Sequence, residues 1–201
     1  MIALDIEGTG VDANKNSILS IGAIDTENPS NQFYEECRVW EGAHISDEAL
    51  TVNGFARVEI EGENTGKQSE GELIQRFVAW ALAIKGDRTF IAQTPGFDRS
   101  FVQAACERAG IACPFAARTI DTHTLCWQHM VQRGLTPPTK NNHSALNLDF
   151  ARTYCGLPEE GKPHNGLTGA LGHAEVFSRI AYTKKLLPDF EEFEIPWTTT
   201  Y

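Results

Sequence analysis

Long apolar runs are absent from this sequence of 201 residues, since no stretch reaches the roughly 18 apolar residues that a membrane-spanning helix needs. Residues 1–7 also lack the basic start and apolar stretch of a secretory signal peptide. We therefore expect a cytoplasmic protein with no membrane partner. The five cysteines form no C-x-x-C pair and are odd in number, which argues against a zinc ribbon and against a disulfide framework. We expect them to be reduced and mostly packed.

Basic residues are also scarce, because 17 lysines and arginines stand against 27 aspartates and glutamates, giving a formal net charge of −10. A protein that coats nucleic acid through bulk electrostatics normally needs a clustered basic surface, so this class is disfavoured. A nuclease is still allowed. A carboxylate cluster that binds divalent cations adds negative charge to the sequence, yet its bound cations present positive charge to a polyanion.

The apolar content of 41% is sufficient for one sizeable core. Apolar segments bounded by turn residues predict three strands that form an antiparallel meander, followed by alternating short strands and helices. Ser69 and Glu72 form the capping-box pattern at the start of the first long helix. The expected strands are 1–6, 17–24, 32–39, 89–92 and 119–121, and the expected helices are 69–84, 97–109, 145–154 and 171–187.

This order of elements predicts an α/β fold in which a mixed central β-sheet is flanked by α-helices. We expect one domain over residues 1–187. Residues 188–201 are acidic and aromatic without clear periodicity, and we expect a C-terminal tail that is packed on the domain or partly disordered.

Two carboxylates, Asp5 and Glu7, interrupt the first apolar strand. Alternate residues of a strand point to one face, so the two groups lie about 6.6 Å apart at the backbone on the same face. Hard oxygen ligands at this separation suit Mg²⁺ or Mn²⁺. A solvent-facing acidic pair at a strand end is the alternative reading of an isolated D-x-E.

The wider context of these residues resembles a known superfamily. Residues 5–10 (DIEGTG), followed by a second apolar strand, resemble the first motif of the DEDD exonucleases, and residues 93–101 (QTPGFDRSF) resemble the second. The resemblance covers residues 1 to about 179 and implies a ribonuclease H-like fold. It also implies that Asp5, Glu7 and Asp98 are metal ligands. At the start of its helix, Asp98 is in addition a good N-cap.

Residues 164–170 (HNGLTGA) are similar to the third motif of the DEDDh subclass, which has a histidine, four residues and an aspartate at the start of the last long helix. His164 therefore matches the general base. Histidine is the side chain whose charge changes near neutral pH, and it can take a proton from an attacking water. Taken alone, a histidine beside Pro163 would more often be an exposed loop residue.

The sequence departs from the subclass at Gly169, which stands where the last aspartate is expected and cannot ligate metal. With three carboxylates instead of four, at least one cation should bind more weakly. His173, one helical turn further on, could approach the gap or be an ordinary helix residue. Because glycines weaken a helix, its start could shift to Thr168 as the cap and leave His164 on a flexible loop.

The resemblance implies a 3′-5′ exonuclease that uses two Mg²⁺ or Mn²⁺ ions to release nucleoside 5′-monophosphates from single-stranded or 3′-end nucleic acid, either DNA or RNA. It also places Thr9 and Gly10 beside the substrate and allows a homodimer. The alternative is a catalytically impaired nucleic-acid-binding or protein-interaction domain of the same fold, which Gly169 supports. Scattered cations could line a phosphate path or simply form a solvated face: Arg99, Lys140, Arg152, Lys162 and Arg179.

Overall fold

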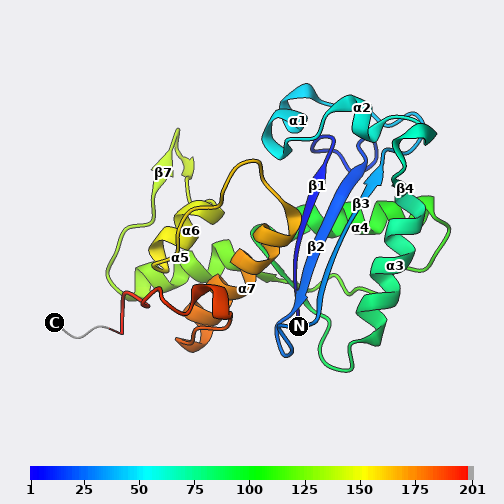
Figure 1. Cartoon of the computed structure of the whole chain (residues 1–201). Helices are drawn as coiled ribbons and strands as arrows, with labels where there is room; N and C mark the ends of the chain where they lie inside the picture. Colours follow the sequence, from blue (N-terminus) through cyan, green and yellow to red (C-terminus); the bar gives the residue numbers. More distant parts are fainter. Residues whose placement is uncertain (199–201) are drawn as a thin grey trace.

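The computed structural model describes residues 1–198 and contains a six-stranded mixed sheet in the order β4-β3-β2-β1-β5-β6 (Figure 1). The first three strands pair antiparallel, as the meander predicted, whereas β5 and β6 run parallel to β1, and β4 runs parallel to β3. This arrangement confirms the expected α/β class. The strands are β1 (Ile2–Gly8), β2 (Ile18–Asp25), β3 (Gln32–Arg38), β4 (Gln68–Ser69), β5 (Phe90–Ala92) and β6 (Ile120–Asp121).

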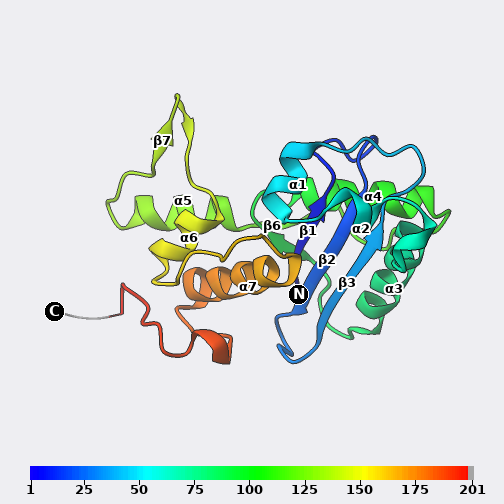
Figure 2. The same cartoon turned by 45° about the horizontal axis from the view of Figure 1, so that its top comes forward.

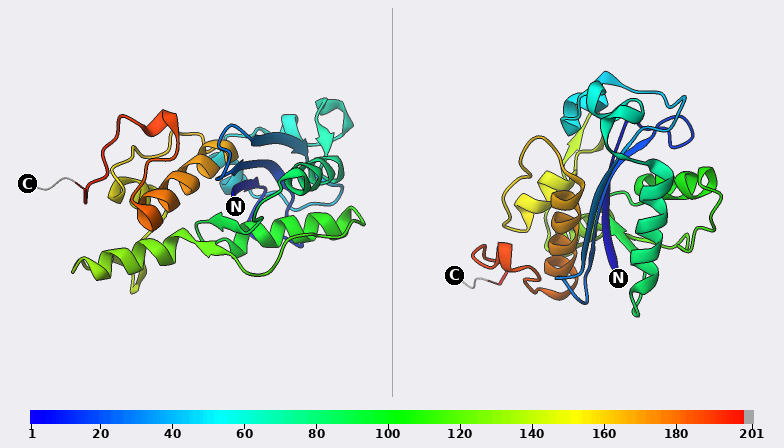
Figure 3. Two further views of the ribbon diagram at one scale, coloured as in Figure 1. Left: turned by 90° about the horizontal axis from the view of Figure 1, so that it is seen from below. Right: turned by 45° about the vertical axis from the view of Figure 1, so that its right-hand side comes forward.

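Helices cover both faces of the sheet. The right-hand view of Figure 3 shows α3 (Glu70–Ala83) and α4 (Gly96–Arg108) on one face and α7 (Gly166–Tyr182) on the other. All eight residues of β2 are consequently buried. The predicted capping box forms at α3, where Ser69 accepts a hydrogen bond from the Glu72 backbone and Glu72 accepts one from the Ser69 backbone.

Two further groups of elements flank this three-layer core. The helices α1 (Asp47–Asn53) and α2 (Arg57–Ile60) and the short η1 (Glu63–Thr65) stand over the end of the sheet at which β1 finishes (Figure 1). Beyond α7 lie α5 (Thr122–Gln132) and α6 (Leu148–Tyr154), from which a small hairpin of β7 (Thr139–Lys140) and β8 (His143–Ser144) projects (Figure 2). The sequence patterns did not predict α1, α2 or α5.

The last long helix begins and ends earlier than expected. Asn165 caps α7, accepting hydrogen bonds from the backbones of Leu167 and Thr168, so the predicted cap at Thr168 is wrong. Glycine is required at the start of this helix because it lies directly on β2. A Cβ on Gly166 would come within 3.0 Å of the Gly22 backbone nitrogen, and a Cβ on Gly22 would come within 2.0 Å of the Gly166 backbone. Close packing thus outweighs the helix penalty of about 1 kcal/mol per glycine.

A fully buried ion pair explains why α7 stops at Tyr182 rather than at residue 187. Glu175 pairs with Arg179 at 2.6 Å and also accepts hydrogen bonds from the backbones of Leu186 and Leu187, which holds that segment outside the helix. Arg179 donates in turn to the Phe190 and Glu194 carbonyls. The pair therefore fixes the chain after the helix, including η2 (Pro188–Phe190).

Several expectations about single residues can be compared with the structure. Arg152 and Arg179 are buried, so neither lines a path for phosphates. The cysteines are all free, and four of the five are buried. Tail residues such as Phe193 and Trp197 pack against the cluster formed by α5, α6 and α7, while the expectation for residues 199–201 lies outside the described residues. Within residues 1–198, no helix has the length and apolarity needed to span a membrane.

Candidate active site

The acidic residues of the first two motifs meet at the end of β1. Asp5 and Glu7 project from the same side of that strand into a cleft of about 270 Å³, and Asp98 enters it from the first turn of α4. The parallel pairing of β1 with β5 explains this meeting, because α4 follows β5 and therefore starts at the same edge of the sheet. The cleft thus brings together three carboxylates from a stretch of sequence in which the first and last, Asp5 and Asp98, are 93 positions apart.

Asp98 does not cap its helix, contrary to the simplest reading of the sequence. Pro95 occupies the position before α4 and makes no side-chain capping bond. Asp98 is almost fully buried, and its Oδ1 accepts a hydrogen bond from the Ile6 backbone at 3.2 Å. This bond ties α4 to the part of β1 between Asp5 and Glu7.

His164 lies at the mouth of the same cleft, immediately before α7. Its backbone donates to the Val52 carbonyl of α1 at 3.3 Å, and its neighbour Asn165 caps α7 while donating from its side chain to the Tyr34 hydroxyl. The side chain is 32% exposed. His164 is therefore anchored on both sides while its imidazole remains open to the cleft and to solvent.

Gly169 faces Asp5 across the gap between α7 and β1. A Cβ on Gly169 would lie 2.1 Å from Asp5 Oδ2, so the Asp5 carboxylate occupies the space in which a side chain at position 169 would stand. His173 approaches the same carboxylate from one turn further along α7, with its Nε2 3.5 Å from Asp5 Oδ1. His173 is only 2% exposed, so it is no ordinary surface residue of the helix.

Sequence patterns missed Asp149 of α6, which lines the cleft, and a second carboxylate, Glu160, which lies in the loop before His164. Its side chain is 6% exposed, lines the same cleft, and lies 3.8 Å from His164 Nδ1. The segment between α6 and α7 has no periodicity from which an orientation could be predicted. Glu160 precedes His164 by only four residues, and this short separation was the one feature of the sequence that could have placed Glu160 near the cleft.

The negative groups of the cleft strongly affect one another. Burial, then the charge of Glu160, raises the pKa of Asp5 well above its usual value. Burial and the neighbouring carboxylates, Asp5 first, raise the pKa of Glu7 to about 8, and burial followed by the charge of Asp5 raises that of Asp98 to about 8. Burial lowers the pKa of His173 to about 4, so this imidazole is neutral at pH 7.

These properties fit a site for divalent cations. Its donors are carboxylate oxygens, which Mg²⁺ and Mn²⁺ prefer. Burial and then mutual repulsion raise the pKa values of Glu7 and Asp98, and a bound cation would offset both effects. As the side chains stand in residues 1–198, no three histidine, cysteine, aspartate or glutamate groups converge tightly enough to hold an ion.

The raised pKa values predict that metal-free protein loses stability as the pH rises. Glu7 and Asp98 keep protons in the folded state that they lose in the unfolded chain above their usual pKa values of 4.5 and 3.8, so their favourable contribution disappears as the pH passes about 8. The lowered pKa of His173 changes the stability of the fold only below pH 6.5, and the contribution of His173 is constant above that pH. The thermal midpoint in EDTA should therefore fall between pH 6.5 and 8.5.

Mg²⁺ should diminish the fall of the thermal midpoint with pH, because the cation compensates the charges of Glu7 and Asp98 in place of their protons. The Asp98→Asn variant in EDTA should show a smaller fall than the unmodified protein. A midpoint in EDTA that is constant or rises over this interval would contradict the assigned shifts.

A second hollow, of about 590 Å³, adjoins the acidic cleft and is mostly apolar. Gly10 and Val11 line it, and Phe97, which is 37% exposed, lines both this hollow and the acidic cleft. Thr9 is completely buried. Its hydroxyl donates to the His44 carbonyl and accepts from the Ser17 backbone, so it supports the loop on which Gly10 is presented.

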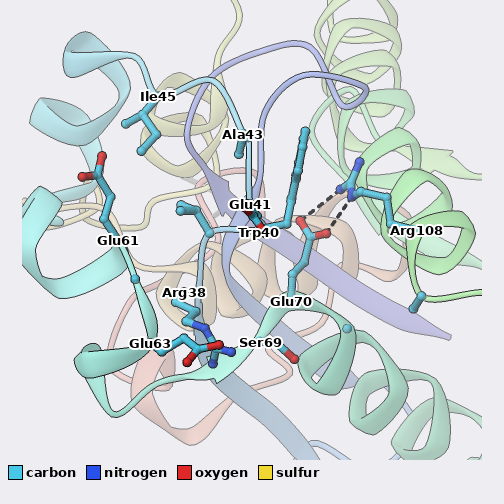
Figure 4. A pocket seen from close by; sticks show the side chains of 15 residues that line it. Arg38, Trp40, Glu41, Ala43, Ile45, Glu61, Glu63, Ser69, Glu70 and Arg108 are labelled. Carbon is cyan, nitrogen blue, oxygen red and sulfur yellow. Dashed lines mark hydrogen bonds and ion pairs between the residues drawn. The ribbon is translucent and has the colours of Figure 1, made fainter.

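A still larger hollow, about 750 Å³, lies away from these groups, between β3, the loop after it, and α3 (Figure 4). Its most prominent charges neutralise each other, since Arg108 forms an ion pair with Glu70 at 2.7 Å while stacking over Trp40. No histidine is among the residues that line it. Size alone is therefore a poor guide to the chemistry of this molecule.

Comparison with known proteins agrees with this geometry. Ribonuclease T of Yersinia pseudotuberculosis (serotype O:1b) is 27% identical over 192 residues, which cover 82% of this chain and 87% of the relative. Ribonuclease T of Haemophilus influenzae (strain Rd) is 29% identical over 122 residues, which cover 55% of this chain, and the match spans about half, 52%, of the relative.

Among solved structures, E. coli exonuclease I in complex with an oligonucleotide superposes with a TM-score of 0.70 at 12% identity, over 91% of this chain and 40% of that one. The nuclease domain of 3′hExo, a DEDDh family member bound to rAMP, gives 0.68 at 16% identity over 92% and 93% of the two chains. These likenesses establish the ribonuclease H-like fold. The sequence profile of the RNase_T family, described as "Exonuclease", matches residues 2–177, and the chain therefore belongs to this exonuclease family of the DEDD superfamily.

Proposed function

We propose that this protein is a metal-dependent 3′-5′ exonuclease that releases nucleoside 5′-monophosphates from single-stranded 3′ ends of DNA or RNA. One observation carries the proposal: Asp5, Glu7, Asp98 and His164 line a single cleft at the end of β1. The fold relatives exonuclease I and 3′hExo, solved with an oligonucleotide and with rAMP respectively, support a nucleic-acid substrate.

Asp5, Glu7 and Asp98 would hold the cations. Bound there, two divalent cations would neutralise the carboxylates, activate a water and stabilise the charge that develops on the leaving oxygen. His164 faces Glu160 through Nδ1, which leaves Nε2 to take the proton of the attacking water. The water oxygen forms a bond to the terminal phosphorus as the bond from phosphorus to the 3′ oxygen of the preceding nucleotide breaks. The released nucleotide consequently carries a 5′ phosphate.

The apolar hollow beside the cleft suits the terminal bases. Phe97 presents a partly exposed ring that lines both the hollow and the acidic cleft, and Gly10 lines the hollow. Stacking of a base on an aromatic ring is tolerant of base and sugar, and contributes about 1–3 kcal/mol. This tolerance fits a nuclease that removes successive nucleotides.

Replacing Phe97 by alanine should therefore weaken oligonucleotide binding by about 5- to 150-fold, as expected from 1–3 kcal/mol. Fluorescence anisotropy with a labelled single strand in Ca²⁺ would measure it. Trp127→Ala on α5 is a matched control, because Trp127 is exposed and lines neither hollow. Equal affinities of the Phe97 and Trp127 variants would remove Phe97 from the binding site.

Paired end labels test the direction of cleavage. With Mg²⁺ or Mn²⁺, a 5′-labelled strand should give a ladder of shortened products, whereas a 3′-labelled strand should release labelled mononucleotide from the start. EDTA should abolish both. A 5′-labelled mononucleotide as the first product would contradict the 3′-5′ direction.

Gly169 supports a second candidate function, in which a domain of this fold binds nucleic acid but no longer cleaves it. The Asp5 carboxylate occupies the space above Gly169, which supports this candidate. A ladder produced by the Gly169→Asp variant and absent from the unmodified protein with both metals would favour it.

A further inference from the structure

Glu160 is recessed in the acidic cleft although the family motifs do not include it. Its Oε1 accepts a hydrogen bond from the Thr168 hydroxyl at the start of α7, and its backbone donates to Asp149 Oδ1 at 3.0 Å. These two contacts fix the loop and leave Oε2 facing His164. The side chain is therefore held in place rather than extended into solvent.

Glu160 forms no ion pair with a lysine or arginine among residues 1–198, and its one ion-pair neighbour is His164 at 3.8 Å. The buried Arg152 of α6 is near enough for the charge of Glu160 to oppose in part the fall that burial causes in the pKa of Arg152. Glu160 faces the other carboxylates, as its influence on both Asp5 and Glu7 indicates. A buried anion beside two further anions is unfavourable unless a cation or protons compensate it. A cation bound in the cleft would compensate the charges of these carboxylates.

His173 is an independent indication that a ligand is missing from this place. It is 2% exposed, it makes no hydrogen bond among the described residues, and its Nδ1 is buried without a partner. Its Nε2 is directed into the same cleft, 3.5 Å from Asp5. A buried imidazole without hydrogen bonds is costly, and a cation in the cleft or its bound water would supply a partner for Nε2.

Position 169 explains why a carboxylate is needed from elsewhere. Gly169 offers no side chain, and Asp5 already fills the space above it. Thr168, the neighbour of Gly169, binds Glu160, so the loop carboxylate is held beside the position that lacks one. We propose that Glu160 supplies the fourth carboxylate of the cation site in place of the side chain that Gly169 lacks, an inference that rests on the proposed metal-dependent function.

Mn²⁺ affinity tests this assignment without any measure of turnover. The dissociation constant is obtained from the electron paramagnetic resonance signal of free Mn²⁺, for the unmodified protein and for Glu160→Gln, Glu159→Gln and Asp5→Asn. Glu159 is the matched control, because it is the adjacent carboxylate and is exposed. Glutamine keeps the size of Glu160 and can still accept the Thr168 hydrogen bond, so the loop should remain folded.

We expect Glu160→Gln to weaken Mn²⁺ binding by at least 10- to 100-fold, since that loss is already typical when a residue that only hydrogen-bonds to a metal ligand is replaced. Glu159→Gln should leave the affinity unchanged. Equal affinities of the Glu160 and Glu159 variants, with Asp5→Asn weakened, would overturn the role of Glu160 alone. Absence of Mn²⁺ binding by the unmodified protein would overturn the proposed function as well.

Discussion

Replacing Asp5 by asparagine is expected to lower the turnover of a single-stranded oligonucleotide by about a thousandfold or more. Asp5 lies on β1, its carboxylate faces Gly169 and His173 of α7, and its charge acts on both Glu7 and Asp98. Asp5 is therefore the central member of the cluster. Metal catalysis contributes several kcal/mol to the transition state, and each 1.36 kcal/mol is a factor of ten in rate. Loss of the central ligand should remove most of that contribution.

The same substitution should raise the thermal midpoint of the metal-free protein at pH 8. The charge of Asp5 raises the pKa of both Glu7 and Asp98, so its removal relieves a repulsion. Turnover is measured with a labelled oligonucleotide and stability by calorimetry. Asp189→Asn, a substitution of an exposed aspartate in the C-terminal segment, is the control for both. A variant at Asp5 that retains a tenth of the activity would contradict its assignment as a ligand.

Replacing His164 by alanine should lower kcat by about 10²- to 10⁴-fold, the usual contribution of a positioned general base. Mn²⁺ affinity should change far less than in Glu160→Gln, because His164 lies at the mouth of the cleft and, as the proposed base, would act on the attacking water and not on the cations. The comparison of kcat with metal affinity separates a proton-transfer role from a ligand role.

The control for this variant is His143→Ala, since His143 is exposed on the hairpin strand β8. Single-turnover rates at saturating metal report the chemical step without product release. If the His164 and His143 variants cleave at the same rate, another group must accept the proton.

The elements predicted best from sequence are those whose signals are local. Ser69 and Glu72 belong to one turn, so the capping box located the start of α3 correctly. The start of α7 depends instead on contacts with β2, where Gly22 and Gly166 lie backbone to backbone. Helix propensities contain no information about such a contact, and they placed the cap three residues too late.

The helix α5 was missed because its buried residues are atypical of a helix core. Thr122, Cys126 and Met130 recur at helical spacing, but two of them are small and the intervening residues include a tryptophan that is exposed. Only the packing of α5 against α7 makes this face recognisable. Apolar periodicity therefore underestimated the helical content beyond the sheet.

For the site, sequence motifs named the residues, and the structure determined their surroundings. Asp5, Glu7, Asp98 and His164 could be aligned with a family pattern, and they lie in one cleft. The role of His173 depended on its distance from Asp5, which helical spacing alone does not provide. Glu160 could not be placed at all, because the orientation of an irregular loop is decided by long-range contacts such as that with Thr168.

The most direct test of the account is mass spectrometry of the products that the unmodified protein releases from a single-stranded oligonucleotide in ¹⁸O-water with Mg²⁺ or Mn²⁺. The account predicts nucleoside 5′-monophosphates that appear in order from the 3′ end, each with one ¹⁸O atom in its phosphate, and none in EDTA. Nucleoside 3′-monophosphates, internal fragments, or no product with either metal would contradict it.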